Sequence, residues 1–263
     1  MSIEDSLREN GYATIAFAEV KPIDDIQKIV SQIFPCPPIE LHKKPIDDNT
    51  RLALVKEAKD AIVKSGYVKQ LLYDNAKLFM TLLGPDIDIQ SDIYLRVSRP
   101  SLESDFIDWH RDTFYGNSYW ELNFWVPIFP LSEGAGLMVV KGSHLTPSHN
   151  VQAVNDQNAF RSTVTKGSLA NELGYLYAPK RDDTISNLDT SQITLLSPPC
   201  GQGILFFTHA AHRAHNASNE TRISMDLRIR SMLAPTNTKP GYYQPLTRGV
   251  IASCVEKMMA MSN

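Results

Sequence analysis

The 263-residue sequence has few cysteines, no long apolar run and no cluster of basic residues. Its three cysteines, Cys36, Cys200 and Cys254, are odd in number and far apart, so they predict neither a disulfide framework nor a zinc site. No apolar stretch approaches the roughly 18 residues that a membrane-spanning helix needs. The formal net charge of −3, without a basic run, gives no sign of a nucleic-acid partner.

A secretion signal is also missing at the start of the sequence. Residues 1–5 are acidic and lack the basic-then-apolar pattern of such a signal, so we expect a cytoplasmic protein with no membrane partner. Hydrophobic residues make up 43% and charged residues 21%, close to the average of globular proteins. The length suits one well-buried core, and we therefore expect a single domain over residues 1–263.

Residues 1–90 have the pattern of helices. Apolar residues recur at helical spacing over 23–34 and again over 51–83, and prolines follow both segments. Gly66 falls inside the second segment, where it is expected to divide the helix in two. This part is predicted to be a mostly helical support region.

The pattern changes to short strands over residues 91–235. Runs rich in β-branched, leucine and aromatic residues are separated by turn residues; they are Ile93–Val97, Leu122–Val126, Leu137–Val140, Ile204–Phe207 and Ile223–Ile229. Many short strands of this kind favour a sandwich or barrel. Within this β-core, residues 146–189 are polar and aperiodic and are predicted to be a lid or insert, and 236–263 a C-terminal extension.

The first candidate site is the segment Trp109-His110-Arg111-Asp112. On an extended chain residues two apart point to the same side, so His110 and Asp112 could bind one ion. A surface histidine beside an ordinary acidic residue would explain this pair equally well.

The second candidate site follows the glycine-rich turn and apolar strand at 201–207. The strand runs into three histidines, His209, His212 and His215, each three residues from the next. A ligand at the end of a rigid strand is what a metal site on a β-scaffold needs. Solvated histidines at a strand end are the alternative.

The third candidate site is Thr221-Arg222-Ile223-Ser224. In a strand Arg222 and Ser224 share one face, where a guanidinium and a hydroxyl would make a good receptor for a carboxylate. A structural salt bridge of Arg222 with an aspartate is the alternative. Arg228 lies on the same face, where it could bind an acidic substrate or, more in keeping with such residues, pair with a carboxylate.

Together these three segments supply, in this order along the sequence, a histidine and a carboxylate, a second histidine, and an anion receptor. Two histidines and one carboxylate form the facial triad of non-haem Fe(II) oxygenases. From residue 109 to about 230 the chain resembles the phytanoyl-CoA dioxygenase-like branch of the Fe(II)/2-oxoglutarate-dependent oxygenases. The matching segments are 109–116, 123–128, Gly134-Ala135-Gly136-Leu137, Gly142-Ser143-His144, 201–206 with His212 and Asn216, and Arg222-Ile223-Ser224.

The resemblance implies a mainly β fold with a helical N-terminal part, in which a double-stranded β-helix (jelly-roll) core is flanked by helices. It implies an oxygenase that uses O₂ and 2-oxoglutarate to hydroxylate or desaturate a small molecule, with release of succinate and CO₂. Because related halogenases replace the carboxylate ligand with a small residue, Asp112 speaks against halogenation. The implied iron ligands are His110, Asp112 and His212, and the implied contacts of 2-oxoglutarate are Arg222 and Ser224. Asn123 is a further candidate contact of the cosubstrate, with an inward-facing asparagine that satisfies a backbone group as the alternative.

The turn after the last proposed iron ligand departs from the pattern of this branch. His212 lies four residues before Asn216 and ten before Arg222, one fewer than is usual in each case. His212 fits because it comes six residues after Phe206, but His209 or His215 could take its place. Extra histidines also suit a cupin-type isomerase or dioxygenase that does not use 2-oxoglutarate. The substrate and the oligomeric state stay open.

Overall fold

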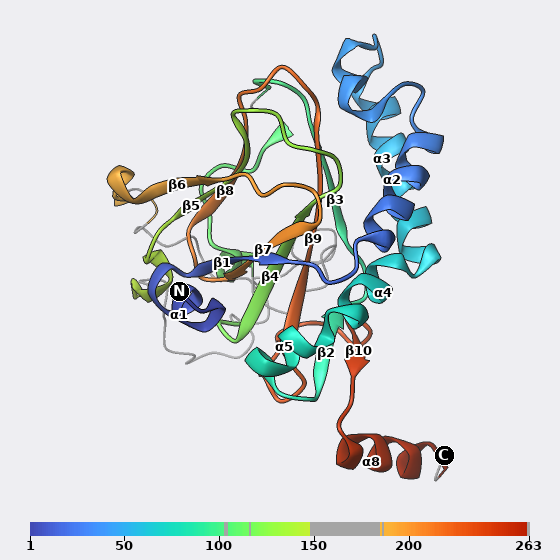
Figure 1. Cartoon of the computed structure of the whole chain (residues 1–263), viewed down its shortest axis with the longest axis vertical. Coiled ribbons are helices and arrows are strands. Elements are labelled where there is room, and N and C mark those ends of the chain that lie inside the picture. Colours follow the sequence, from blue (N-terminus) through green and yellow to red (C-terminus); the bar gives the residue numbers. More distant parts are fainter. Residues whose placement is uncertain (103–104, 116, 148–184, 186, 262–263) are drawn as a thin grey trace, which may run out of the picture.

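A computed structural model describes residues 1–102, 105–115, 117–147, 185 and 187–261. Six α-helices lie in this part: α1 Ile3–Asn10, α2 Lys21–Ile33, α3 Asp48–Ser65, α4 Tyr67–Asp74, α5 Ala76–Leu83 and α8 Val250–Met261. Helices α2, α3 and α4 form a column along one side of the strands (Figure 1). None of the described helices is long and apolar enough to cross a membrane.

The helix boundaries have local causes that the sequence partly predicts. The Asp47 side chain accepts a hydrogen bond from the Thr50 backbone N–H and caps α3, and Gly66 ends the helix at φ 76°. This confirms the division at Gly66. A second break, at Asn75, was not predicted: its side chain donates to Leu71 O and accepts from Ala18 N, both at 2.8 Å.

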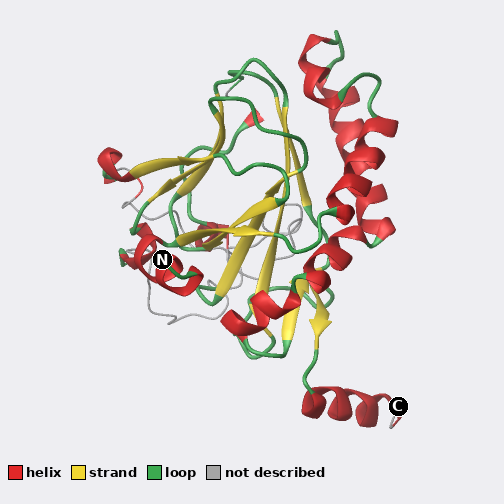
Figure 2. Ribbon diagram, viewed as in Figure 1, coloured by secondary structure: helices red, strands yellow, loops and turns green. Residues whose placement is uncertain are grey.

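The described strands form two antiparallel sheets (Figure 2). The larger has the order β1-β7-β4-β9-β2-β10, with β3 also paired to β9. Its strands are β1 Tyr12–Ala16, β2 Ile87–Gln90, β3 Tyr94–Ser98, β4 Glu121–Pro127, β7 Gln202–Phe207, β9 Arg222–Ser231 and β10 Tyr243–Thr247. The smaller has the order β6-β5-β8 and comprises β5 Ala135–Val140, β6 Ile193–Leu196 and β8 His212–Asn216.

The expectation of a mainly β fold with a helical N-terminal part is confirmed. Strand β1 lies within the segment predicted to be mostly helical, where it pairs with β7, and β10 lies within the C-terminal segment, where it pairs with β2. The proposed lid over 146–189 lies almost wholly outside the described residues.

The central strands of the larger sheet separate two environments. On β4, Phe124 and Val126 belong to the large apolar core under the helices, and Phe124 contacts the rings of Phe17 and Phe79 edge-on, with centroids 5.7 Å apart in each case. Trp125 instead packs with Leu137 of β5 in a cluster between the two sheets.

The side chains of strand β9 also alternate between these two environments. Ile223, Met225, Leu227 and Ile229 lie in the helical-side core, so the alternate residues face the space between the sheets. Those residues are Arg222, Ser224, Asp226, Arg228 and Arg230. A row of polar side chains inside a β-core needs partners, and those partners locate the candidate site.

Candidate metal centre

Hydrogen bonds between backbones bring the three proposed ligands together. His110 and His212 form an isolated antiparallel bridge, in which each N–H donates to the other's carbonyl, at 3.1 and 2.9 Å. Asp112 begins the short 3-10 turn Asp112–Tyr115, and its N–H donates to Thr208 O at 2.8 Å. The segment that carries the first two ligands is therefore fixed to the strand ends that carry the third.

The side chains of these residues converge on one point. His110 Nε2 lies 3.5 Å and His212 Nε2 lies 3.8 Å from Asp112 Oδ1. One ligand atom from each residue lies within 4.8 Å of the other two. Two nitrogens and one oxygen at these separations could bind a single metal ion.

Both imidazoles are oriented with Nε2 toward the common point. His110 Nδ1 lies 2.7 Å from Asp108 O and His212 Nδ1 lies 2.9 Å from Ala210 O. A carbonyl oxygen only accepts, so each Nδ1 carries the proton and each Nε2 presents a lone pair. Burial, and then the neighbouring His110, lowers the pKa of His212 to about 3, so its ring is neutral at physiological pH.

The two carboxylate oxygens of Asp112 have different environments. Oδ2 accepts hydrogen bonds from Arg228 Nη2 at 2.6 Å and from Asn123 Nδ2 at 2.8 Å, whereas Oδ1 faces the imidazoles. Burial alone would raise the pKa of Asp112, but Arg228, followed by the two histidines, holds it well below its usual value. The carboxylate is therefore charged, and one oxygen remains for a metal.

Asn123 lines the same cavity as Arg222, and its amide donates to Asp112 Oδ2. Its contact with the cosubstrate stays a prediction. Arg228 pairs with a carboxylate, as its position favoured, and that carboxylate belongs to a proposed ligand. The alternation of Arg222, Ser224, Asp226 and Arg228 was the signal for Arg228, but no sequence pattern named its partner.

The other two candidate histidines lie elsewhere. His209 is buried between Thr113 Oγ1, 3.0 Å from its Nδ1, and Thr146 O, 3.0 Å from its Nε2. His215 lines a neighbouring cavity and lies outside the group of converging ligands found in the described residues. Of the three histidines, His212 is the one that reaches Asp112.

Arg222 is a buried cation with neutral partners. Its Nη1 donates to Gly136 O at 2.6 Å and its Nη2 to Ser98 Oγ at 2.9 Å. Among the described residues no carboxylate forms an ion pair with Arg222, so the alternative of a structural salt bridge is not found. Burial, and then Arg96, lowers the pKa of Arg222 to about 10. Its Nε and the Ser224 hydroxyl are buried without a hydrogen-bond partner in the structure.

A single small cavity joins Arg222 to the proposed ligands. It has a volume of about 60 Å³ and is lined by the three ligands, Arg222, Asn123, Trp125 and Phe206, among others. A larger cavity of about 470 Å³, which contains His215, shares Ile107 and Ala214 with it. Arg222 and the three proposed ligands therefore line the same space, whereas Ser224 is not part of its lining.

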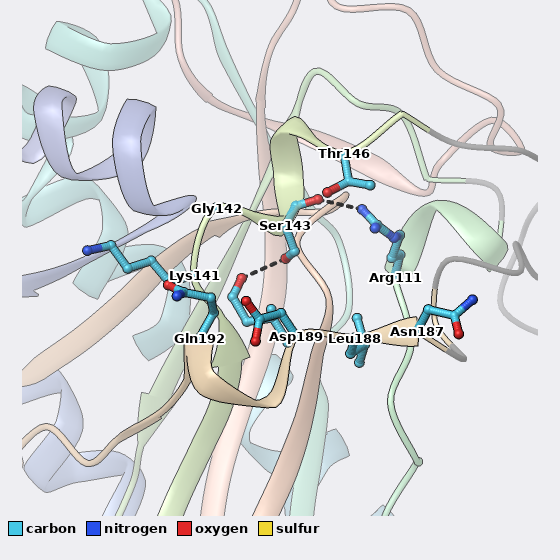
Figure 3. Close-up of a pocket in the computed structure, with 10 residues that line it drawn as sticks. Arg111, Lys141, Gly142, Ser143, Thr146, Asn187, Leu188, Asp189 and Gln192 are labelled. Carbon is cyan, nitrogen blue, oxygen red and sulfur yellow. Dashed lines mark hydrogen bonds between the residues drawn. The ribbon is translucent and has the colours of Figure 1, made fainter.

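A third cavity, of about 430 Å³, is lined mainly by residues between 140 and 146 and between 187 and 192 (Figure 3). It is lined by Arg111, whose side chain leaves the chain between His110 and Asp112 but donates to Ser143 O and His209 O, each at 2.7 Å. None of the three proposed ligands lines this cavity. Arg111 thus ties the segment that carries His110 and Asp112 to the backbone of Ser143 and His209.

Comparison with known proteins gives matches at the level of structure. No family model and no curated protein sequence matches the chain. Among solved structures, the non-heme monooxygenase ThoJ, in a nickel complex, superimposes with a TM-score of 0.58 at 11% identity, over 94% of this chain and 84% of ThoJ. The chain shares its fold with ThoJ.

Two further structures agree. SnoK, a non-heme alpha-ketoglutarate-dependent carbocyclase from nogalamycin biosynthesis, superimposes with a TM-score of 0.54 at 13% identity, over 94% of this chain and 97% of SnoK. EvdO2 from Micromonospora carbonacea var. aurantiaca gives 0.51 at 13% identity, over 91% and 94% of the two chains. Another structure of EvdO2 contains 2-oxoglutarate. The chain therefore shares its mainly β fold with these enzymes as well.

Proposed function

We propose that this chain is an Fe(II)- and 2-oxoglutarate-dependent oxygenase that hydroxylates, or desaturates, a small molecule. One observation carries the proposal: Arg222, a buried guanidinium with no carboxylate partner among the described residues, shares a cavity with two imidazoles and a carboxylate that converge. A metal site alone would not need that cation. We also propose that the two sheets close into the jelly roll of this enzyme class.

The ligand set fits Fe(II). Two neutral imidazoles and one carboxylate oxygen suit this metal and leave further coordination positions for a chelating 2-oxo acid and for O₂. Bound iron would supply the oxidative chemistry in which 2-oxoglutarate, O₂ and a substrate C–H give succinate, CO₂ and a C–OH. Arg228 and Asn123 hold Asp112 Oδ2, so the carboxylate would hold the metal with Oδ1.

Arg222 and Ser224 are proposed to bind the far carboxylate of 2-oxoglutarate. Arg222 Nε and Ser224 Oγ are both buried donors without partners, on the same face of β9. An anionic ligand would neutralise the guanidinium and satisfy both groups, and charge-assisted bonds of this kind are the strong ones. A structure of EvdO2, which has a similar fold, contains 2-oxoglutarate.

The substrate is proposed to occupy the cavity of about 470 Å³ beside the metal pocket, within the size range of small-molecule sites. Ile107 and Ala214 line both spaces, so a ligand there would lie next to the iron and the cosubstrate. The cupin-type alternative drew on extra histidines as ligands, and neither His209 nor His215 belongs to the converging group.

The test is anaerobic titration with Fe(II) and 2-oxoglutarate, followed by the visible absorption band of a 2-oxo acid chelated to Fe(II). We expect a band in the wild type and none in His212→Ala, whereas His209→Ala, a matched loss of a buried histidine, should retain it. Arg222→Ala should need far more 2-oxoglutarate. Bound iron without a band would remove 2-oxoglutarate from the mechanism; a normal band in His212→Ala would remove His212 from the ligand set.

A further inference from the structure

The cavity of about 470 Å³ beside the metal pocket is lined by one arginine. Arg213 directly follows the proposed ligand His212 on β8, so its side chain leaves the strand on the opposite face. Its Cζ lies over the ring of Trp109, 5.4 Å from the centroid. Arg213 Nε is buried and has no hydrogen-bond partner among the residues that the structure describes. A buried donor of this kind destabilises the protein until an acceptor, such as a group of a bound ligand, satisfies it.

The carboxylate nearest to Arg213 leaves it available to a ligand. Asp108 Oδ1 lies 3.9 Å from Arg213 Nη1, beyond hydrogen-bond distance, and accepts the Trp109 backbone N–H at 2.7 Å instead. The Asp108 side chain is 74% exposed, so water screens its attraction to the guanidinium. In the described part of the chain Arg213 forms no other ion pair. A better placed anion would therefore gain most of the charge of Arg213.

A second polar side chain lines the same cavity. His215 lies two residues after Arg213, so the two side chains share one face of β8. Within the described residues nothing forms a hydrogen bond with the His215 ring. Burial, and then Arg213 and Arg222, lowers the pKa of His215, so the ring is neutral at physiological pH and presents one N–H donor. A guanidinium and an imidazole donor thus lie beside each other without an acceptor.

Much of the remaining lining is apolar. Phe106, Ile107, Ala214 and Ala217 contribute to it, and Ile107 and Ala214 line the metal pocket as well. A ligand whose polar end lies at Arg213 would meet apolar side chains along the rest of its length. The two residues shared by both spaces place that apolar part next to the metal pocket.

We propose that the substrate is a carboxylic acid with an apolar body, and that Arg213 and His215 bind its carboxylate. This inference rests on the proposed function and names the substrate class of that site. A carboxylate would accept from the guanidinium fork and so satisfy Nε. A single carboxylate also matches the charge of the cavity, because Asp108 offsets part of the one positive charge that Arg213 supplies, which leaves too little for a dianionic phosphate. A fixed carboxylate would determine which carbon of the apolar body meets the metal pocket.

Two ligands of the same shape and different charge test the proposal on the wild type. 3-Phenylpropionate and 3-phenylpropionamide are titrated into the full chain by calorimetry without oxygen, with Fe(II) and with 2-oxoglutarate at saturation, so that Arg222 is already occupied. We expect the acid to bind at least about tenfold more tightly than the amide. Equal affinities, or an acid that does not bind, would overturn the proposal.

Three variants locate the preference for the acid. Arg213→Gln should remove most of the difference between acid and amide, whereas Arg8→Gln, a matched loss of an arginine that is 72% exposed on α1, should retain it. His215→Phe keeps a ring but no donor and should weaken binding of the acid about three- to tenfold. An acid affinity that Arg213→Gln leaves unchanged would refute the assignment of Arg213.

The absorption band of 2-oxoglutarate chelated to Fe(II), recorded in the same samples, separates this inference from the proposed function. We expect a normal band in all three variants, because none of them removes a proposed ligand or Arg222. A wild type without the band would refute the proposed function and the acid site with it. A normal band together with equal affinities for acid and amide would refute the acid site alone. If Arg213→Gln lost the band through misfolding, the comparison of acid and amide in the wild type would still decide.

Discussion

Replacement of Arg222 by methionine should stabilise the protein without ligand while it removes affinity for 2-oxoglutarate. The guanidinium is 3% exposed, and the fall of its pKa from 12.5 to about 10 corresponds to roughly 3 kcal/mol by which the buried cation destabilises the folded chain at neutral pH. Its two hydrogen bonds, to Gly136 O and Ser98 Oγ, stabilise the folded chain by roughly 1 kcal/mol each. The net gain for Arg222→Met is about 1 kcal/mol, or about 3 °C in Tm.

Arg228 on the same strand should respond in the opposite way. It forms a buried ion pair with Asp112 at 2.6 Å, and removal of one partner from such a pair typically destabilises by about 3–5 kcal/mol. Urea unfolding of metal-free Arg222→Met and Arg228→Met compares the two. Calorimetry with Fe(II) and 2-oxoglutarate, without oxygen, should show about 100-fold weaker cosubstrate binding in Arg222→Met. If Arg222→Met destabilises the apoprotein as Arg228→Met does, Arg222 is a satisfied structural residue and the reasoning fails.

Two further substitutions test the polar interior. Asn123→Leu removes one donor to Asp112 Oδ2 without a change of charge and should weaken Fe(II) binding about 10- to 100-fold. A loss of 2-oxoglutarate affinity at unchanged Fe(II) affinity would instead show that Asn123 contacts the cosubstrate and does not support the metal ligand. Burial raises the pKa of Glu121 to about 7, although Tyr243, Arg228 and Arg230 act to lower it. An acid with a raised pKa contributes stability at low pH that is lost as pH rises from about 4.5 to about 7. Glu121→Gln should therefore gain roughly 3 kcal/mol over the wild type between pH 4.5 and 8 in thermal unfolding. Parallel stability curves for the two proteins would contradict the assignment of that acid.

Local sequence patterns predicted what depends on neighbours along the chain. The segments Leu122–Val126 and Ile204–Phe207 are mostly apolar and were predicted as strands, and Gly66 was predicted to divide a helix; all three features were found. The short run of β1, Tyr12–Ala16, lies among helices and has one paired neighbour in the described structure, β7, which follows it by almost two hundred residues. Such a distant pairing leaves no local signal.

The site shows the same division. The spacing of His110 and Asp112 predicts that they share a side, and the register from Phe206 selects His212; the structure brings these three residues together. The hydrogen bond of Ser98 to Arg222 depends on the register of β3 against β9, which no pattern within either strand encodes. For the same reason the sequence suggested that Arg228 binds a carboxylate, but only the fold identifies it as Asp112.

The alternation of β9 limits which changes of length the protein can tolerate. Arg222 and Arg228 stand six residues apart on one face, so a residue inserted between them would turn one of the two into the apolar core under the helices. The turn before β9 has no such restriction. There Asn216 receives a hydrogen bond from Ser218 and donates one to Glu220 O, and the strands on either side keep their own pairings. Loss of one residue from this turn, which the spacing from His212 to Arg222 suggests, should therefore leave the site intact. A deletion within β9 should disrupt the site, so evolution is expected to change the length of the turn and not that of the strand.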